Sequence, residues 1–153
     1  AKHRSLSDLP IVDVRVFNYF SHTQDMNARF LITDIVRALK NNEVFKTSSD
    51  NIVRDFVTPP GFYALIQAII DFKPINTALD CYTKSPVSKF DLLSELESKF
   101  GLNYEINESI DIINATGSKI NYYSTNKIAK DMGYDPINTS LESVIQEINF
   151  LGL

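Results

Sequence analysis

The sequence of 153 residues contains no tryptophan, a single cysteine and only five glycines. The lone cysteine, Cys81, excludes an internal disulfide, which is typical of a protein in a reducing cytoplasm. No apolar run approaches the roughly 20 residues that a membrane-spanning helix needs, so we expect no membrane segment. The charged start, Ala1 to Ser5, has no apolar stretch behind it and does not indicate a secretory signal.

Basic residues are too few for a protein that binds nucleic acid through its phosphates. The 15 lysines and arginines are outnumbered by 19 aspartates and glutamates, which gives a net charge of -4 and a pI near 5.1. Phosphate contacts normally require an excess of positive charge, so we expect no nucleic-acid partner. What is present is an ordinary soluble balance, 44% hydrophobic and 22% charged, in a chain long enough for one domain with a core.

Apolar patterning predicts an α/β chain in which strands and helices alternate. Residues 11–17 are nearly continuously apolar and β-branched, which favours a parallel strand covered on both faces. In the helix over residues 62–72 we expect Leu65, Ile66, Ile69 and Ile70 to face inward. The predicted strands cover 11–17, 51–58, 77–82, 102–106 and 118–124, and the predicted helices cover 28–41, 62–72, 88–100, 125–132 and 139 to the C-terminal region.

Several helix ends are assigned from the residues found there. Ser88 resembles the start of a capping box, and Gly101 provides a left-handed residue that ends the same helix. Asn27 and Thr125 are expected to cap the helices that follow them. Thr139, or the serine after it, is expected to cap the last helix.

Short segments along the chain carry a resemblance to a known family. Arg15, Phe17 and Asn18 give the order Arg-x-Phe-Asn at the end of a strand, and residues 54–57 read Arg-Asp-Phe-Val. Together they resemble the back half of the extended short-chain dehydrogenases/reductases, the NAD-dependent epimerases and dehydratases that remodel nucleotide-activated sugars. Further matches to the family pattern follow in the same order at 126–128, 132–136 and 140–142.

The sequence also departs from that family pattern. After Asn18, the family's Val-Tyr-Gly-Pro-x-Gln loop keeps only Gln24, and Pro59-Pro60-Gly61 replaces a Val-Asp-Asp turn. The Gly-x-x-Gly-x-x-Gly cofactor fingerprint and the Tyr-x-x-x-Lys pair are both absent. The resemblance therefore implies, for residues 1–153, the C-terminal part of a Rossmann-like enzyme with its small helical substrate-binding subdomain, without the N-terminal dinucleotide-binding part.

The start of the chain is interpreted in the same way. It lacks an initiating methionine, and we expect a fragment that begins midway along the helix that carries the Tyr-x-x-x-Lys pair. Lys2 is an alternative for that lysine, but too few residues separate it from Ile11 for the family's long helix. We therefore expect no catalytic residue in this chain alone, and expect NAD or NADP to be bound mainly by the missing part of a parent enzyme.

The resemblance implies three substrate-binding residues. Asn18 ends a strand, where α/β sheets place ligands, and its amide can donate and accept. Arg54 is expected to contact the nucleotide diphosphate through its planar guanidinium. The alternatives are an asparagine that ties down a loop and a solvated pair of Arg54 with Asp55. The family's second phosphate-binding arginine falls at Asn114, which does not match, and Lys119 is expected to supply that charge.

Other polar residues are secondary candidates. Arg29 is a candidate for the same cleft, with a solvated helix position as the alternative. His22 shows no partner that would make it a general base, and Asp13 and Arg15 share a strand face on which they can pair. Cys81 is expected to be inert packing in an apolar strand. No spacing of histidine, cysteine and acidic residues indicates a metal site.

The aromatic residues are interpreted mostly as core. We expect core positions for Tyr63, Tyr82, Tyr104 and Tyr134, which lie inside periodic segments. One residue near the cleft is expected to stack on a nucleotide base, and the candidates are Tyr19, Phe20 and Tyr123.

Three hypotheses of function follow. The first is the substrate-binding fragment of an NAD(P)-dependent nucleotide-sugar epimerase or dehydratase, or of an NDP-hexose reductase of the same superfamily, in polysaccharide biosynthesis. The second is a non-catalytic binding or scaffold module that retains the half-fold, and the third is an unrelated α/β domain. A half-fold exposes the edge of its first strand, so we expect a homodimer or association with the missing N-terminal half.

Overall fold

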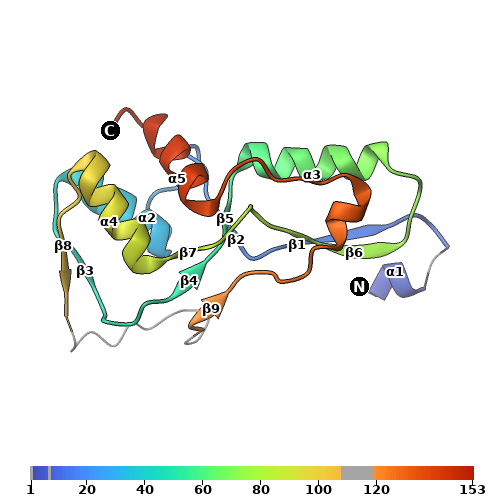
Figure 1. Cartoon of the computed structure of the whole chain (residues 1–153), viewed down its shortest axis with the longest axis horizontal. Helices are drawn as coiled ribbons and strands as arrows, with labels where there is room; N and C mark the ends of the chain where they lie inside the picture. The colour runs from blue at the N-terminus through green and yellow to red at the C-terminus, as the bar shows by residue number, and fades with distance from the viewer. Residues whose placement is uncertain (1, 7, 108–118) are drawn as a thin grey trace.

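A computed structural model describes residues 2–6, 8–107 and 119–153, and it has the mixed α/β architecture that the sequence predicts (Figure 1). The helices are α1 (Lys2–Ser5), α2 (Leu31–Asn41), α3 (Pro59–Asp71), α4 (Lys89–Phe100), the 3₁₀ helix η1 (Ile128–Met132) and α5 (Ser140–Asn149). The strands are β1 (Val12–Val16), β2 (Asn18–Tyr19), β3 (Phe45–Thr47), β4 (Val53–Arg54), β5 (Phe56–Val57), β6 (Thr77–Cys81), β7 (Val87–Ser88), β8 (Tyr104–Ile106) and β9 (Asn121–Tyr122).

Parallel pairing dominates the small sheets. β1 pairs with β6, β2 with β5 and β3 with β8, all in parallel. β4 lies between β7, which is antiparallel to it, and β9, which is parallel. Figure 1 shows α3 beside the β1–β6 pair at one end of the molecule, and α2 and α4 with β3 and β8 at the other. The short strands β2, β4 and β5 lie between these two ends and connect them.

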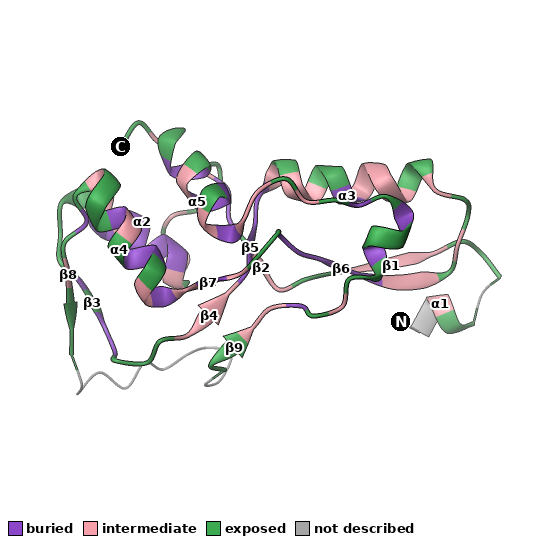
Figure 2. Ribbon diagram, viewed as in Figure 1, coloured by how far each residue is buried: buried purple, intermediate pink, exposed green. Residues whose placement is uncertain are grey.

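The core is divided in the same way. One cluster joins α2, α4 and α5 through side chains such as Ile35, Leu93 and Val144, which are fully buried. A second cluster lies between α3, β6 and η1 and includes Leu65 and Leu79. Figure 2 shows the buried residues of the helices on their inward sides. The first cluster agrees with the small helical subdomain expected from the sequence.

Strand β1 is less covered than its composition predicts. Val12 and Val14 pack against the second cluster, but Val16 is 38% exposed. Among the described residues β1 pairs only with β6, and the alternate side chains Asp13 and Arg15 point away from the apolar cluster into ion pairs. The prediction of a strand buried on both faces is therefore wrong for this chain, because its second face is polar.

Helix α2 begins three residues later than predicted. Phe30, not Asn27, occupies the N-cap position, and it has no side chain that can accept a hydrogen bond. The hydroxyl of Thr33 replaces that function, because it accepts the main-chain N–H of Phe30 at 3.2 Å. The later start places Phe30 and Leu31 at the edge of a cavity described below.

Both ends of α4 and the start of α5 follow their sequence signals. Ser88 caps α4, and Gly101 ends it in the left-handed region at φ 72°. Thr139 caps α5 in a capping box. The 3₁₀ helix η1 begins after Lys127, so the prediction of Thr125 as its cap is wrong. Of the helices in the described ranges, none combines the length and hydropathy that a bilayer span requires.

Helix α3 exposes more of its surface than its apolar sequence predicts. Tyr63 is 67% exposed and Ile70 is 68% exposed, so both predictions of core positions are wrong. Leu65 is the one described residue of α3 that is fully buried, because the helix packs on one side only. Tyr82 and Tyr134 are buried as expected, and the Tyr134 hydroxyl donates to the Tyr82 carbonyl at 2.6 Å.

Candidate functional site

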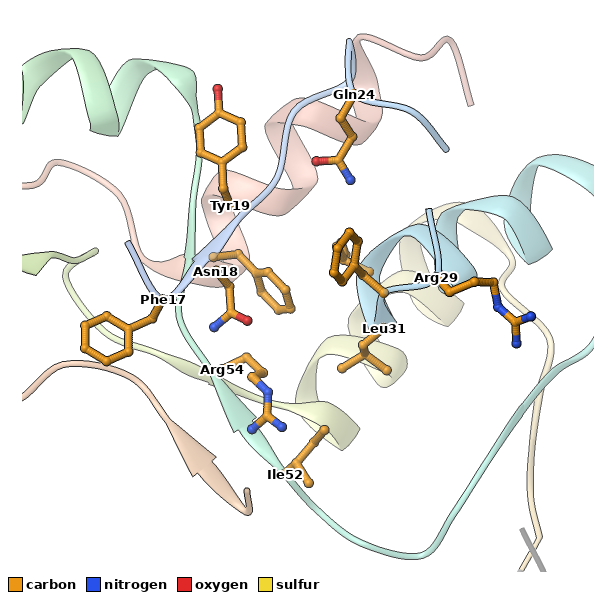
Figure 3. Close-up of a pocket in the computed structure, with 11 residues that line it drawn as sticks. Phe17, Asn18, Tyr19, Gln24, Arg29, Leu31, Ile52 and Arg54 are labelled. Carbon is orange, nitrogen blue, oxygen red and sulfur yellow. The ribbon is translucent and has the colours of Figure 1, made fainter. Parts of the chain in front are cut away.

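A cavity of about 440 Å³ opens just beyond the C-terminal end of β1. Main-chain pairing of β2 with β5 brings the segment after β1 beside the one that carries Arg54. Polar groups of Asn18, Gln24 and Arg54 line the cavity together with an apolar wall, whose members include Phe30, Leu31 and Ile52 (Figure 3). In open α/β sheets, ligands bind at the carboxyl ends of the strands, and this cavity has that position.

Asn18 and Arg54, the two principal candidates from the sequence, line the same cavity. Figure 3 shows the carboxamide of Asn18 and the guanidinium of Arg54 close to each other on one side of it. The Asn18 side-chain nitrogen donates to the carbonyl of Tyr122 at 3.3 Å. That contact fixes the rotation of the amide and leaves its oxygen as an acceptor for a hydroxyl group.

Three main-chain carbonyls hold the guanidinium of Arg54. Its Nη1 donates to Val53 at 2.8 Å and to Ile120 at 3.1 Å, and its Nη2 donates to Lys119 at 2.8 Å. Burial lowers the pKa of Arg54. A guanidinium nevertheless stays protonated in proteins, so the cavity has a fixed positive charge.

Asp55 does not form the solvated pair with Arg54 that the sequence left open. It is buried, and its carboxylate accepts the Thr83 hydroxyl at 2.5 Å and the Thr83 N–H at 3.1 Å. Successive residues of an extended chain point to opposite sides, so neighbours in sequence are separated here. Arg54 therefore faces the cavity while Asp55 faces the interior.

Lys119 lies next to Arg54 through its main chain. Its ammonium lies 4.4 Å above the ring of Tyr122, in a cation–π contact, and the Tyr122 ring contacts Phe17 at a centroid distance of 5.2 Å. Lys119 itself is exposed. Asn114, the position to which the family's second arginine corresponds, lies outside the described residues.

Arg29 lines the rim of the cavity and is largely solvated. Its side chain is 86% exposed, with Nε 3.7 Å from a carboxylate oxygen of Asp34. Figure 3 shows its guanidinium directed away from Asn18 and Arg54. The two arginines of the cavity thus differ, since one is fixed inside it and the other extends into solvent.

Of the three aromatic candidates for base stacking, the structure places one on the cavity. Tyr19 lines it and is half-exposed, and burial together with the charge of Glu147 raises the pKa of its phenol. Phe20 is completely buried in the first cluster, so its assignment as a stacking residue is wrong. Tyr123 is half-buried and is not among the residues that line the cavity.

His22 has a partner that sequence reasoning did not find. Its Nδ1 lies 2.7 Å from a carboxylate oxygen of Glu147, and that same oxygen accepts the His22 main-chain N–H at 2.9 Å. Glu147 lies on α5 and is buried. The imidazole is therefore attached to α5, and His22 is not among the residues that line the cavity.

Asp13 and Arg15 do not pair with each other, contrary to prediction. Asp13 accepts Nε of Arg4 at 3.0 Å, and Arg15 donates its Nε to Asp80 at 2.5 Å. Arg15 and Asp80 are direct neighbours in the parallel register of β1 and β6. The register decides this pairing, because it brings a buried carboxylate next to the arginine.

Cys81 is buried, as expected, and burial raises the pKa of its thiol to about 11. A thiol with that pKa is a poor nucleophile at neutral pH. Within the described ranges, no three histidine, cysteine or acidic residues come together as metal ligands would.

Sequence reasoning missed the apolar wall of the cavity. Phe30 and Leu31 lie at the start of α2, and Ile52 precedes β4. Each stands at the boundary of a predicted element, where periodicity carries little information. The exposure of Phe30 just before α2 becomes visible only in the structure.

No family model and no curated protein sequence matches this chain. Solved structures do match it. UDP-glucuronic acid 4-epimerase from Bacillus cereus, in complex with UDP-glucuronic acid and NAD, aligns with a TM-score of 0.75 at 17% identity, over 94% of this chain and 45% of that one. UDP-glucose 4-epimerase from Thermotoga maritima, with UDP-glucose, aligns with a TM-score of 0.71 at 14% identity, over 92% of this chain and 45% of that one. dTDP-glucose 4,6-dehydratase from Bacillus anthracis, in complex with NAD, aligns with a TM-score of 0.73 at 12% identity, over 99% of this chain and 47% of that one.

All three are extended short-chain dehydrogenases/reductases of the epimerase and dehydratase type, and this chain corresponds to their C-terminal portion. It spans less than half of their length. At such low identity the likeness is one of fold, and it confirms the fold that the sequence motifs predict. This chain thus has a mixed α/β fold that matches the C-terminal portion of those Rossmann-like enzymes.

Proposed function

We propose that this chain is the C-terminal, nucleotide-sugar-binding portion of an NAD(P)-dependent epimerase or dehydratase. The observation that carries the proposal is the shared position of Asn18 and Arg54 on one cavity, at the end of a parallel strand. The fold of the chain supports it, since the solved neighbours include enzymes in complex with UDP-sugars.

In this proposal Arg54 binds the diphosphate. Three of its five N–H donors contact main-chain carbonyls, which leaves two for phosphate oxygens. The Asn18 oxygen accepts a hydroxyl of the sugar or ribose, and Phe30 and Leu31 provide the apolar surface for the base. Lys119 contributes a second positive charge when its ammonium leaves the Tyr122 ring.

The glycines that the structure describes do not form a cradle for the pyrophosphate of a dinucleotide cofactor. Such a site needs glycines clustered at a helix N-terminus. Gly101 and Gly133 instead end helices, Gly152 follows the last one, and Gly61 lies within α3. NAD or NADP, which supplies hydride transfer, is therefore assigned to another part of the parent enzyme, and no catalytic step is assigned to this chain.

The open side of β1 supports a proposed partner. Among the described residues this strand is paired on one edge, and its last residue, Val16, is partly exposed. An unpaired strand edge attracts another strand. We assign that position to the N-terminal half of the parent enzyme or, in its absence, to a second copy of this chain.

Nucleotide sugars of this type feed polysaccharide synthesis in the cytoplasm, where we place the parent enzyme.

Isothermal titration of UDP into the chain tests the proposal. We expect wild type to bind UDP, and Arg54→Met to weaken binding by at least tenfold, because a charge-assisted phosphate contact is lost. Arg29→Met is the matched control, since it removes an arginine of the same cavity that extends into solvent. The absence of UDP binding by the wild type, or equal losses in both variants, would contradict the proposal.

A further inference from the structure

The side chains of Asn18 and Arg54, both proposed to bind substrate, donate hydrogen bonds to one short stretch of main chain. The carbonyls of Lys119 and Ile120 accept the Arg54 guanidinium, and the carbonyl of Tyr122 accepts the Asn18 amide. We call residues 119–122 the carbonyl segment. The direction in which Asn18 and Arg54 face the cavity therefore depends on where this segment lies.

The pairing of the carbonyl segment with its neighbour is short. Its strand β9 has two residues, which pair in parallel with the two residues of β4. The Val53 N–H donates to the Ile120 carbonyl at 2.8 Å. Strands in globular proteins are usually longer than this, so two pairs alone hold a segment weakly. A further anchor is needed to fix its carbonyls.

That anchor lies two residues further along the chain. The Ser124 hydroxyl donates to an oxygen of Asp80 at 2.5 Å, and both side chains are buried. Ser124 Oγ also accepts the Asn126 N–H at 2.9 Å, which fixes the turn that follows. The other Asp80 oxygen accepts Nε of Arg15. One carboxylate thus joins the two strands β1 and β6 to the end of the carbonyl segment.

We infer that Ser124 and Asp80 are positioning residues for the Asn18–Arg54 site, acting through the carbonyl segment. The inference rests on the proposed function for the identity of the ligand, a nucleotide. The positioning role itself is argued from hydrogen bonds within the chain. A hydrogen bond to a buried carboxylate is stronger than a neutral one, and losing it frees the segment. Arg15 stays beside Asp80 in a Ser124→Ala variant, and Lys127 also acts on Asp80 electrostatically, so the carboxylate keeps its counter-charge.

The first measurement is UDP binding by calorimetry. We expect Ser124→Ala to weaken binding about tenfold, because the freed segment must be ordered again when UDP binds and this cost subtracts from the affinity. Ser124→Thr keeps the hydroxyl and is expected to stay within about threefold of wild type. Thr139→Ala, which removes the cap of α5, lowers stability without touching the segment and should bind like wild type. Equal losses in the alanine variants, or none in Ser124→Ala, would overturn the inference.

The second measurement needs no ligand and separates this inference from the proposed function. In Ser124→Ala the amide of Val53 should exchange with solvent faster, because its acceptor Ile120 is displaced. The amide of Phe20, which donates to Val57, should exchange at the wild-type rate. Unchanged exchange at Val53 overturns the positioning role even where UDP binds. Faster exchange in a chain whose wild type does not bind UDP supports the role of Ser124 and rejects the nucleotide site.

Discussion

The imidazole of His22 lies 2.7 Å from the carboxylate of Glu147, although 125 positions separate the two residues in the sequence. The same carboxylate oxygen accepts the main-chain N–H of His22. The loop that follows β2 is thereby attached to α5, the last helix. Because that loop also contributes Gln24 to the cavity, the C-terminal helix holds one side of the candidate site.

Replacing Glu147 with alanine should destabilise the fold. The variant leaves the His22 N–H without its acceptor in a part-buried position, which costs about 1–3 kcal/mol. Urea denaturation of Glu147→Ala measures this loss, and an unchanged free energy of unfolding would contradict the prediction. A double-mutant cycle with His22→Ala isolates the contact between the imidazole and the carboxylate, because His22→Ala keeps the main-chain N–H.

The thiol of Cys81 should resist modification in the folded protein. It is buried, and its pKa is raised to about 11, so the thiolate is scarce at pH 8. Ellman's reagent should label less than a tenth of the protein within minutes at that pH, and all of it in urea, where the thiol has its ordinary pKa. Rapid labelling without denaturant would show that β6 opens easily.

Stability should fall on acidification, and Glu142 should contribute to the fall. Its pKa lies below the ordinary 4.5, chiefly because the carboxylate accepts the Thr139 N–H at the start of α5. A lowered folded-state pKa stabilises the fold above the ordinary value, and this contribution is lost as the pH falls through the folded-state pKa. Glu142→Gln should therefore be less stable than wild type at pH 7, with a smaller difference at pH 3. A constant difference at both values would refute this.

The chain should associate through the open edge of β1. Light scattering coupled to size exclusion is expected to give a mass that rises with concentration above the 17.3 kDa of a monomer. Val16→Lys adds charge at the exposed end of this strand and should reduce the association. A compact monomer of the wild type at all concentrations would contradict the expectation.

The sequence predicts most elements of this fold and fewer of its contacts. Ser88, Gly101 and Thr139 are local signals, and each helix end they indicate is confirmed. The start of α2 is missed because the capping group comes from inside the helix, at Thr33. Ile70 is misplaced because periodicity shows that a helix has an apolar face, but not how much of it another element covers.

For the candidate site too, the sequence predicts residues but not the contacts that position them. The family resemblance implies that Asn18 and Arg54 both bind substrate, and the structure brings them to one cavity. The pairing of Arg15 with Asp80 depends on the register of β1 and β6, which no local pattern specifies. Two of the three carbonyls that hold Arg54 belong to main chain more than sixty positions away, and main-chain groups leave no signature in a sequence.

The three carbonyls around Arg54 also determine how it would recognise an anion. A flexible arginine loses rotamer freedom when it binds, and that entropy subtracts from the affinity. Here the side chain is already confined before any ligand arrives, so little mobility remains to be lost. A lysine at this position would have neither the planar fork nor enough donors to bind the main chain and an anion together. The cavity is thus preorganised for a planar, multidentate contact.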